Sequence, residues 1–128
     1  MPNAHTVLVV DDDEHIRKLV SSALQSAGFT VLVASHGQMA MQVADSYTGV
    51  IDVLLTDVIM PGITGPLLAL TLKASRPHLK ILLMSGHTAG LFVDGYGWPL
   101  IQKPFRTVEV IGQLRAVLGE PQRPVPEA

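Results

Sequence analysis

The chain has 128 residues, of which 48% are hydrophobic and 16% are charged, and its formal net charge is −2. This composition predicts one folded domain with a hydrophobic core and argues against disorder of the whole chain. The near balance of charges, without a run rich in Lys or Arg, argues against nucleic-acid binding. The absence of cysteine excludes disulfides and Cys-ligated zinc. With neither a signal peptide nor an apolar stretch of about 20 residues, we expect a cytoplasmic protein without membrane contact.

Five short apolar runs follow one another along the chain, each of strand length. They cover residues 6–10, 30–34, 53–56, 81–84 and 100–101. The runs are apolar at nearly every position rather than at alternate positions, which is typical of strands buried on both faces of a parallel sheet.

The first two segments between these runs have the apolar spacing of helices. The first helix is expected after Asp12 or Asp13, either of which can cap its start, and Gly28 suits its end. The second is expected to open at Ser35, because Gln38 follows at the spacing of a capping box. Helices that alternate with strands predict an α/β fold with right-handed crossovers and helices on both faces of the sheet.

The second half of the chain predicts two further clear helices and one weak segment. Pro66 suits the first turn of one helix, whereas Thr107 and Gly119 suit the cap and the stop of the last. Residues 87–99 hold three glycines and a proline, so at most a short helix is expected, around residues 89–94. Residues 120–128 read as a proline-rich flexible tail after a domain of residues 1–119.

Polar side chains follow four of the five strands, where each strand ends. Asp11 and Asp12 follow the first strand, Asp57 ends the third, Ser85 ends the fourth and Lys103 follows the fifth. The carboxyl ends of parallel strands meet at one edge of a sheet, which is where such folds bind their ligands. Three carboxylates in one place destabilise one another unless a cation joins them, and hard oxygen ligands suit Mg²⁺.

An aspartate, a lysine, a hydroxyl and a divalent cation together favour phosphoryl transfer. One of the carboxylate oxygens would attack phosphorus, while Lys103 and Mg²⁺ would neutralise the transferred oxygens. The product would be an acyl phosphate on that aspartate.

Four motifs at these strand ends resemble the receiver domain of bacterial two-component response regulators. They are Val-Val-Asp-Asp-Asp-Glu at 9–14, Leu-Thr-Asp-Val-Ile-Met-Pro-Gly at 55–62, Leu-Met-Ser-Gly-His at 83–87 and Gln-Lys-Pro-Phe at 102–105. They occur in the order of the family, and the resemblance covers residues 6–118. The last two motifs look most like the receivers of hybrid sensor histidine kinases.

The resemblance implies a phosphorelay role and a set of metal ligands. Asp57 would take a phosphoryl group from a phosphohistidine of a sensor histidine kinase or phosphotransfer protein, which would change partner binding. Asp12 would bind Mg²⁺ directly and Asp11 through water, with Asp57 and the main-chain carbonyl of Ile59 as further ligands. The chain would not be an enzyme beyond its own phosphorylation and dephosphorylation.

The resemblance also implies the fold and the phosphoryl contacts. Ser85 would bond the phosphoryl group and Lys103 would pair with it. The Lys103–Pro104 peptide would be cis. The fold would be flavodoxin-like, a doubly wound five-stranded parallel sheet in the order 2-1-3-4-5.

Two features depart from the family pattern, and both concern how phosphorylation would be passed on to a partner protein. The switch position three residues before the lysine, which holds Tyr or Phe in the family, is Leu100. Ser85 and Lys103 lie 18 positions apart, which is short for the family by about one helical turn. The fourth helix is therefore expected to be short or irregular. His87, two residues past Ser85, is a candidate for influencing the loss of phosphate.

Two other functions remain open from the residues alone. One is a phosphorylation-independent interaction module, which Leu100 favours. The other is a small phosphatase with an aspartate nucleophile, for which the Asp11-x-Asp13 pattern gives superficial support. The sequence does not decide whether the chain stands alone or is part of a hybrid kinase.

Overall fold

The apolar runs of the sequence form one five-stranded parallel sheet in the order β2-β1-β3-β4-β5. The protein is described by a computed structural model covering residues 4–86 and 96–119. Its strands are β1 (Thr6–Val10), β2 (Thr30–Ala34), β3 (Val53–Asp57), β4 (Lys80–Ser85) and β5 (Leu100–Gln102). Its helices are α1 (Glu14–Ser26), α2 (Gly37–Ser46), α3 (Gly65–Ser75) and α5 (Thr107–Val117). The predicted α/β class, strand order and parallel pairing are therefore confirmed.

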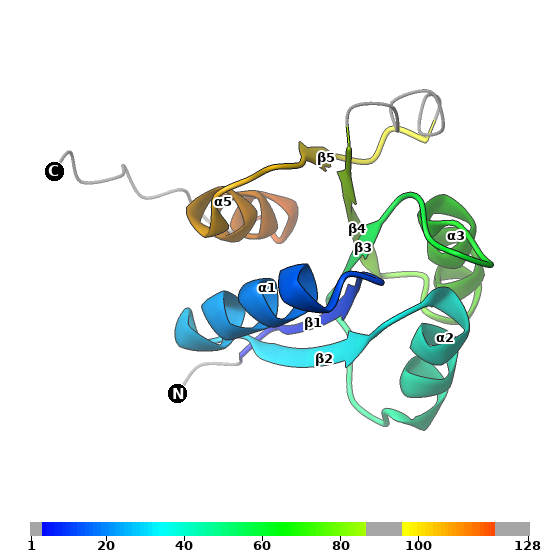
Figure 1. Ribbon diagram of the computed structural model, residues 1–128. Coiled ribbons are helices and arrows are strands. Elements are labelled where there is room, and N and C mark those ends of the chain that lie inside the picture. The colour runs from blue at the N-terminus through cyan, green and yellow to red at the C-terminus, as the bar shows by residue number, and fades with distance from the viewer. Residues whose placement is uncertain (1–3, 87–95, 120–128) are drawn as a thin grey trace, which may run out of the picture.

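The helices cover the sheet in two layers, with α1 and α5 on one side and α2 and α3 on the other (Figure 1). Two buried clusters correspond to these layers. In one, Val20 and Leu24 of α1 pack with Val110 and Leu114 of α5 against the sheet. In the other, Leu68 and the neighbouring apolar residues of α3 and α2 pack against the opposite face.

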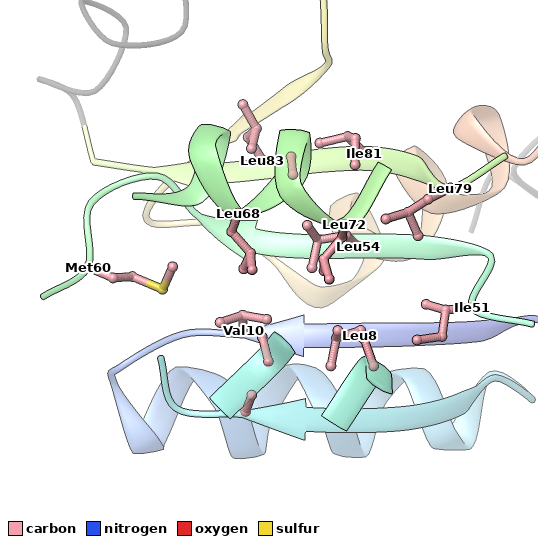
Figure 2. Close-up of a cluster of buried hydrophobic side chains, with 14 of the residues drawn as sticks. Leu8, Val10, Ile51, Leu54, Met60, Leu68, Leu72, Leu79, Ile81 and Leu83 are labelled. Atoms are coloured by element: carbon pink, nitrogen blue, oxygen red, sulfur yellow. The ribbon is translucent and has the colours of Figure 1, made fainter. Parts of the chain in front are cut away.

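Figure 2 shows the second cluster, in which side chains of β1, β3 and β4 meet those of α3. Leu8, Leu54, Leu68 and Leu83 have no exposed surface. Burying a leucine side chain contributes about 1.5–3 kcal/mol. Packing on both faces thus holds the central strands in place, and it fixes the positions of the residues at their carboxyl ends.

The burial of the sheet differs from the expectation at its two edges. Every residue of β1 and β3 is buried, as are five of the six residues of β4. In β2, however, Thr30 and Val33 are exposed, and in the predicted run of β5 Leu100 is only half-buried. The prediction of complete burial is wrong for these two strands, which lie at the two edges of the sheet.

Two predicted helix caps are also wrong by one residue. Helix α2 is capped by His36 rather than Ser35, since the His36 Nδ1 accepts a hydrogen bond from the Met39 N–H at 3.1 Å. In α5 the cap is Arg106, and Thr107 is the first helical residue. The predicted Asp13 cap of α1 is confirmed.

The backbone conformations predicted after two helices and before Pro104 are confirmed. Gly28 and Gly119 follow α1 and α5 with positive φ, and the Lys103–Pro104 peptide is cis, as predicted. The expected short helix at residues 89–94, His87 and the tail lie outside the described residues. Within the ranges 4–86 and 96–119, no helix has the length and apolar character needed to cross a bilayer.

Candidate functional site

Asp57 is the last residue of β3, and its position is fixed by the strands and helix around it. It lies opposite Met84 of β4, and the following N–H, of Val58, donates to the Met84 carbonyl at 2.9 Å. The Gly65 N–H at the start of α3 donates to the Val58 carbonyl at 2.8 Å. Only 8% of the residue's surface is exposed. The carboxylate is thus presented from a rigid strand end rather than from a free loop.

Lys103 joins two carboxylates that come from different strands. Its Nζ donates to Asp11 Oδ2 at 2.8 Å and to Asp57 Oδ2 at 3.3 Å. The Lys103 N–H also donates to the Ser85 carbonyl at 2.7 Å, which continues the pairing of β4 with β5. The ammonium therefore lies where four of the five strands end.

Asp11 is fully buried, and both of its carboxylate oxygens are bonded. The Asp13 N–H donates to Oδ1 at 2.9 Å, and Lys103 bonds Oδ2. Asp13 in turn caps α1 by accepting from the N–H groups of His15 and Ile16. A buried carboxylate needs such partners, because an unpaired one is strongly disfavoured.

The pKa values of the central pair reflect this competition between burial and charge. Burial raises the pKa of Asp57, Asp11 raises it further, and Lys103 lowers it, with a net increase. For Lys103, burial alone lowers the pKa, but the hydrogen bond and charge of Asp11, together with Asp57, outweigh it and raise the pKa. The lysine therefore stays charged, and its positive charge stabilises the ionised form of the neighbouring carboxylates.

Three carboxylates have the arrangement of a possible cation site. Oxygens of Asp11, Asp12 and Asp57 all lie within 4.8 Å of one another, and the Asp12 side chain is exposed to solvent. Hard oxygen donors with room for water fit Mg²⁺. Ile59 lies in the loop after β3 and is 51% exposed. Its aliphatic side chain has no donor atom, so only its main-chain carbonyl is available as a ligand.

Ser85 ends β4 with a buried hydroxyl that lacks a partner. The residue is 1% exposed, and its Oγ makes no hydrogen bond with the described part of the chain. A buried polar atom without a partner costs free energy, about 1–3 kcal/mol. Such an atom beside a cluster of charged groups calls for a ligand or another function.

Leu100, the predicted switch position, begins β5 opposite Leu83. It is half-buried and packs against the cluster between the sheet and α3. Close to it in the chain, the rings of Tyr96 and Trp98 stack, with centroids 4.9 Å apart and planes 13° apart. Leu100 therefore contributes to apolar packing but is not fully buried.

Two residues at the site have no counterpart in the sequence-based predictions. Arg17 of α1 donates from Nη1 to the Asp11 carbonyl at 2.8 Å. Gly65 lies so close to the Asp57 carbonyl that a β-carbon there would overlap its oxygen. In the sequence, the closest indication of the role of Gly65 is its place between Thr64, which caps α3, and Pro66. For Arg17 the sequence gives no indication beyond its position in the first predicted helix.

Comparisons with known proteins agree with this architecture. The family model of the response regulator receiver domain matches residues 7–115. The sensor kinase CckA of Brucella abortus is 36% identical over 117 residues, 88% of this chain and 12% of that protein. The DNA-binding transcriptional regulator NtrC of Rhizobium meliloti is 34% identical over 122 residues, 92% of this chain and 25% of that protein.

A solved structure supports the same comparison. The receiver domain of the hybrid histidine kinase CckA is 26% identical, with a TM-score of 0.76 over 88% of this chain and 98% of that one. The chain spans only a small part of the two curated relatives, 12% and 25% of their lengths. The likeness therefore concerns only one part of those proteins.

Proposed function

The chain belongs to the receiver domain family of two-component response regulators, and on this basis we propose that it accepts a phosphoryl group on Asp57. The donor would be a phosphohistidine of a sensor histidine kinase or a phosphotransfer protein. One observation supports the proposal above others: a buried strand-end carboxylate, Asp57, lies 3.3 Å from the Lys103 ammonium and belongs to a group of three carboxylates.

The chemistry follows from the groups at the site. A carboxylate oxygen of Asp57 forms a bond to phosphorus while the bond from phosphorus to the histidine nitrogen breaks, which gives an acyl phosphate and a free imidazole. Lys103 pairs with the added negative charge. The buried Ser85 hydroxyl is available to donate to a phosphoryl oxygen, which gives a role to an otherwise unpartnered group.

Mg²⁺ is the cofactor that these residues fit. Asp11, Asp12 and Asp57 would hold it, with the main-chain carbonyl of Ile59 as a further ligand. When bound, the ion would neutralise charge on the phosphoryl oxygens. The residues of this chain would supply the remaining contacts, through Lys103 and Ser85.

In this proposal the domain is a cytoplasmic switch rather than an enzyme with an external substrate. Phosphorylation would change the binding of a downstream protein. NtrC of Rhizobium meliloti is named as DNA-binding, but the net charge of −2 in this chain does not favour DNA as its own partner.

Phosphorylation by a small donor tests the proposal. The purified protein is incubated with acetyl phosphate and Mg²⁺, and its intact mass is measured. We expect a gain of one phosphoryl group in the native protein and none in Asp57→Asn. Asp45→Asn, at an exposed position of α2, is the matched control and should gain the group normally. An unmodified native protein would favour the phosphorylation-independent module, and an undiminished gain in Asp57→Asn would exclude Asp57 as the acceptor.

A further inference from the structure

Arg17 reaches back from α1 to the loop that joins β1 to this helix. Its side-chain Nη1 donates to the Asp11 carbonyl at 2.8 Å, across six positions of the chain. Its own N–H donates to the Asp13 carbonyl at 2.9 Å in the first turn of the helix. A guanidinium bonded to a main-chain carbonyl in this way fixes the direction of that peptide group.

The bonds of this loop hold both peptide groups that flank Asp12. The Asp11 carbonyl belongs to the peptide between Asp11 and Asp12, and Arg17 holds it. The Asp13 N–H belongs to the peptide between Asp12 and Asp13, and Asp11 Oδ1 holds it at 2.9 Å. Because each peptide group is planar, fixing both planes fixes the direction in which the Asp12 side chain leaves the backbone.

We propose that Arg17 is the positioning residue for Asp12 as a ligand of Mg²⁺, an inference that rests on the proposed function. The Asp12 side chain is exposed, so packing does not orient it, and the backbone of the loop must do so. Asp11 has direct bonds to both of its oxygens, whereas Asp12 depends on its two flanking peptides. Of the two bonds that hold these peptides, one comes from the Asp11 side chain and the other from Arg17 on α1.

The two effects of Arg17 on a bound cation have opposite signs. As a cation near the carboxylates, it repels Mg²⁺, so removal of its charge alone would strengthen binding. As a positioning residue, it lowers the cost of presenting Asp12, so its removal would weaken binding. Removing a group that orients a metal ligand typically weakens metal affinity about 10–100-fold. The direction of the change therefore distinguishes the two roles.

A pair of charge-matched variants provides the test. Arg17→Met removes the guanidinium and its bond to Asp11. Lys18→Met removes a neighbouring cation whose side chain is 75% exposed and whose ammonium pairs with Glu14 at 2.9 Å. Mg²⁺ is titrated into each full-length protein and followed by calorimetry. We expect Arg17→Met to bind Mg²⁺ about 10-fold more weakly, and Lys18→Met to bind it as the native protein does or slightly more tightly. Unchanged or tighter binding by Arg17→Met would overturn the proposal.

Amide hydrogen exchange without metal provides the second readout. In Arg17→Met the Asp13 N–H should exchange faster, because the loop that holds it is loosened. The Val58 N–H, bonded to Met84 in the other loop of the site, should exchange as in the native protein. Equal exchange of the Asp13 N–H in both proteins would contradict the positioning role. If Arg17→Met does not fold, Arg17→Gln removes the same charge with a good helix former.

The two readouts separate this inference from the proposed function. If the native protein binds no Mg²⁺, the metal part of the proposed function fails, and exchange of the Asp13 N–H still decides whether Arg17 orders the loop. If the native protein binds Mg²⁺ and Arg17→Met binds it equally well, only the role of Arg17 is wrong.

Discussion

Asp57 is the residue at which burial and charge oppose each other most directly. Its surroundings favour the neutral form through burial and through Asp11, whereas Lys103 favours the ionised form. A nucleophilic carboxylate must be ionised to attack phosphorus, so the lysine that receives the phosphoryl charge also maintains the reactive state of the acceptor. The same opposition has a consequence for stability.

The raised pKa of Asp57 predicts that ionising this residue destabilises the fold. The folded protein keeps the Asp57 proton at pH values where the unfolded chain has lost it. The stabilising contribution is therefore present below the unfolded pKa and lost as the pH rises through the folded pKa. At pH 7 we expect Asp57→Asn to unfold at a higher urea concentration than the native protein. The difference should shrink as the pH falls through the folded pKa and should be gone below the ordinary pKa of Asp, about 4.

Urea denaturation at several pH values measures this dependence. Asp45→Asn, which removes an exposed carboxylate from α2, should shift the midpoint little at any pH. An Asp57→Asn midpoint equal to or below that of the native protein at pH 7 would show that the Lys103 pair outweighs burial.

Individual residues of the site differ in how far the sequence predicts them. Asp11, Asp57 and Lys103 each follow an apolar run, so their positions at strand ends are enough to predict that they meet. The bonds from Lys103 to both carboxylates agree with that expectation. Arg17 was not predicted, because a bond from a side chain to a carbonyl six residues earlier leaves no periodic signal. Such a contact can be predicted only once the direction of α1 relative to β1 is known.

At the scale of elements, the start of α3 is packed directly against the end of β3. A β-carbon on Gly65 would overlap the Asp57 carbonyl oxygen. The backbone cannot move without shifting the strand end, so we expect Gly65→Ala to destabilise the fold by about 1–3 kcal/mol, the usual cost of overpacking. We also expect slower phosphorylation of Asp57 by acetyl phosphate, since its carboxylate is displaced.

Gly112 of α5 offers the matched control. A β-carbon there meets no atom within 4 Å, and glycine within a helix is less favourable than alanine by about 0.5–1 kcal/mol. Gly112→Ala should therefore stabilise the fold and leave phosphorylation unchanged. Equal denaturation midpoints for the two alanine variants would contradict the tight contact at Gly65.

The cap of α2 gives a second prediction at this scale. Because the His36 Nδ1 accepts from the Met39 N–H, His36→Ala should lower the free energy of unfolding by about 0.5–2 kcal/mol. Ser35→Ala should have a smaller effect, since the Ser35 hydroxyl faces only the Met39 sulfur, at 3.6 Å. Urea denaturation of both variants measures the difference. A larger loss for Ser35→Ala would restore the cap that the sequence predicts.

Elements were predicted better in their existence than in their details. All five strands were expected within one or two residues, because continuous apolar runs are a strong signal. The cap at His36 was missed because histidine is not among the favoured cap residues, and Ser35 with Gln38 matched the usual pattern. Exposure of β2 and β5 was missed because the apolar pattern does not show which strands lie at the edges.

At the scale of the whole molecule, two apolar clusters pack on the faces of the sheet, and the polar residues of the site lie at the carboxyl ends of its strands. The clusters on the two faces of the sheet bury β1 and β3 completely and all of β4 except Lys80, and the charged residues lie where those strands end. The alternation of strands and helices predicted this arrangement, whereas the order of the strands came from the family resemblance. Leu100, which is half-buried against the apolar cluster, is the residue at which the chain departs from the family pattern.

The most direct test of the central claim is to locate the phosphoryl group on the chain. The native protein is treated with acetyl phosphate and Mg²⁺, reduced with borohydride and mapped by peptide mass spectrometry. Reduction of an acyl phosphate on aspartate leaves homoserine in its place. We expect homoserine at Asp57 only, and only when Mg²⁺ is present. Homoserine at Asp11 or Asp12, or none at any aspartate, would contradict it.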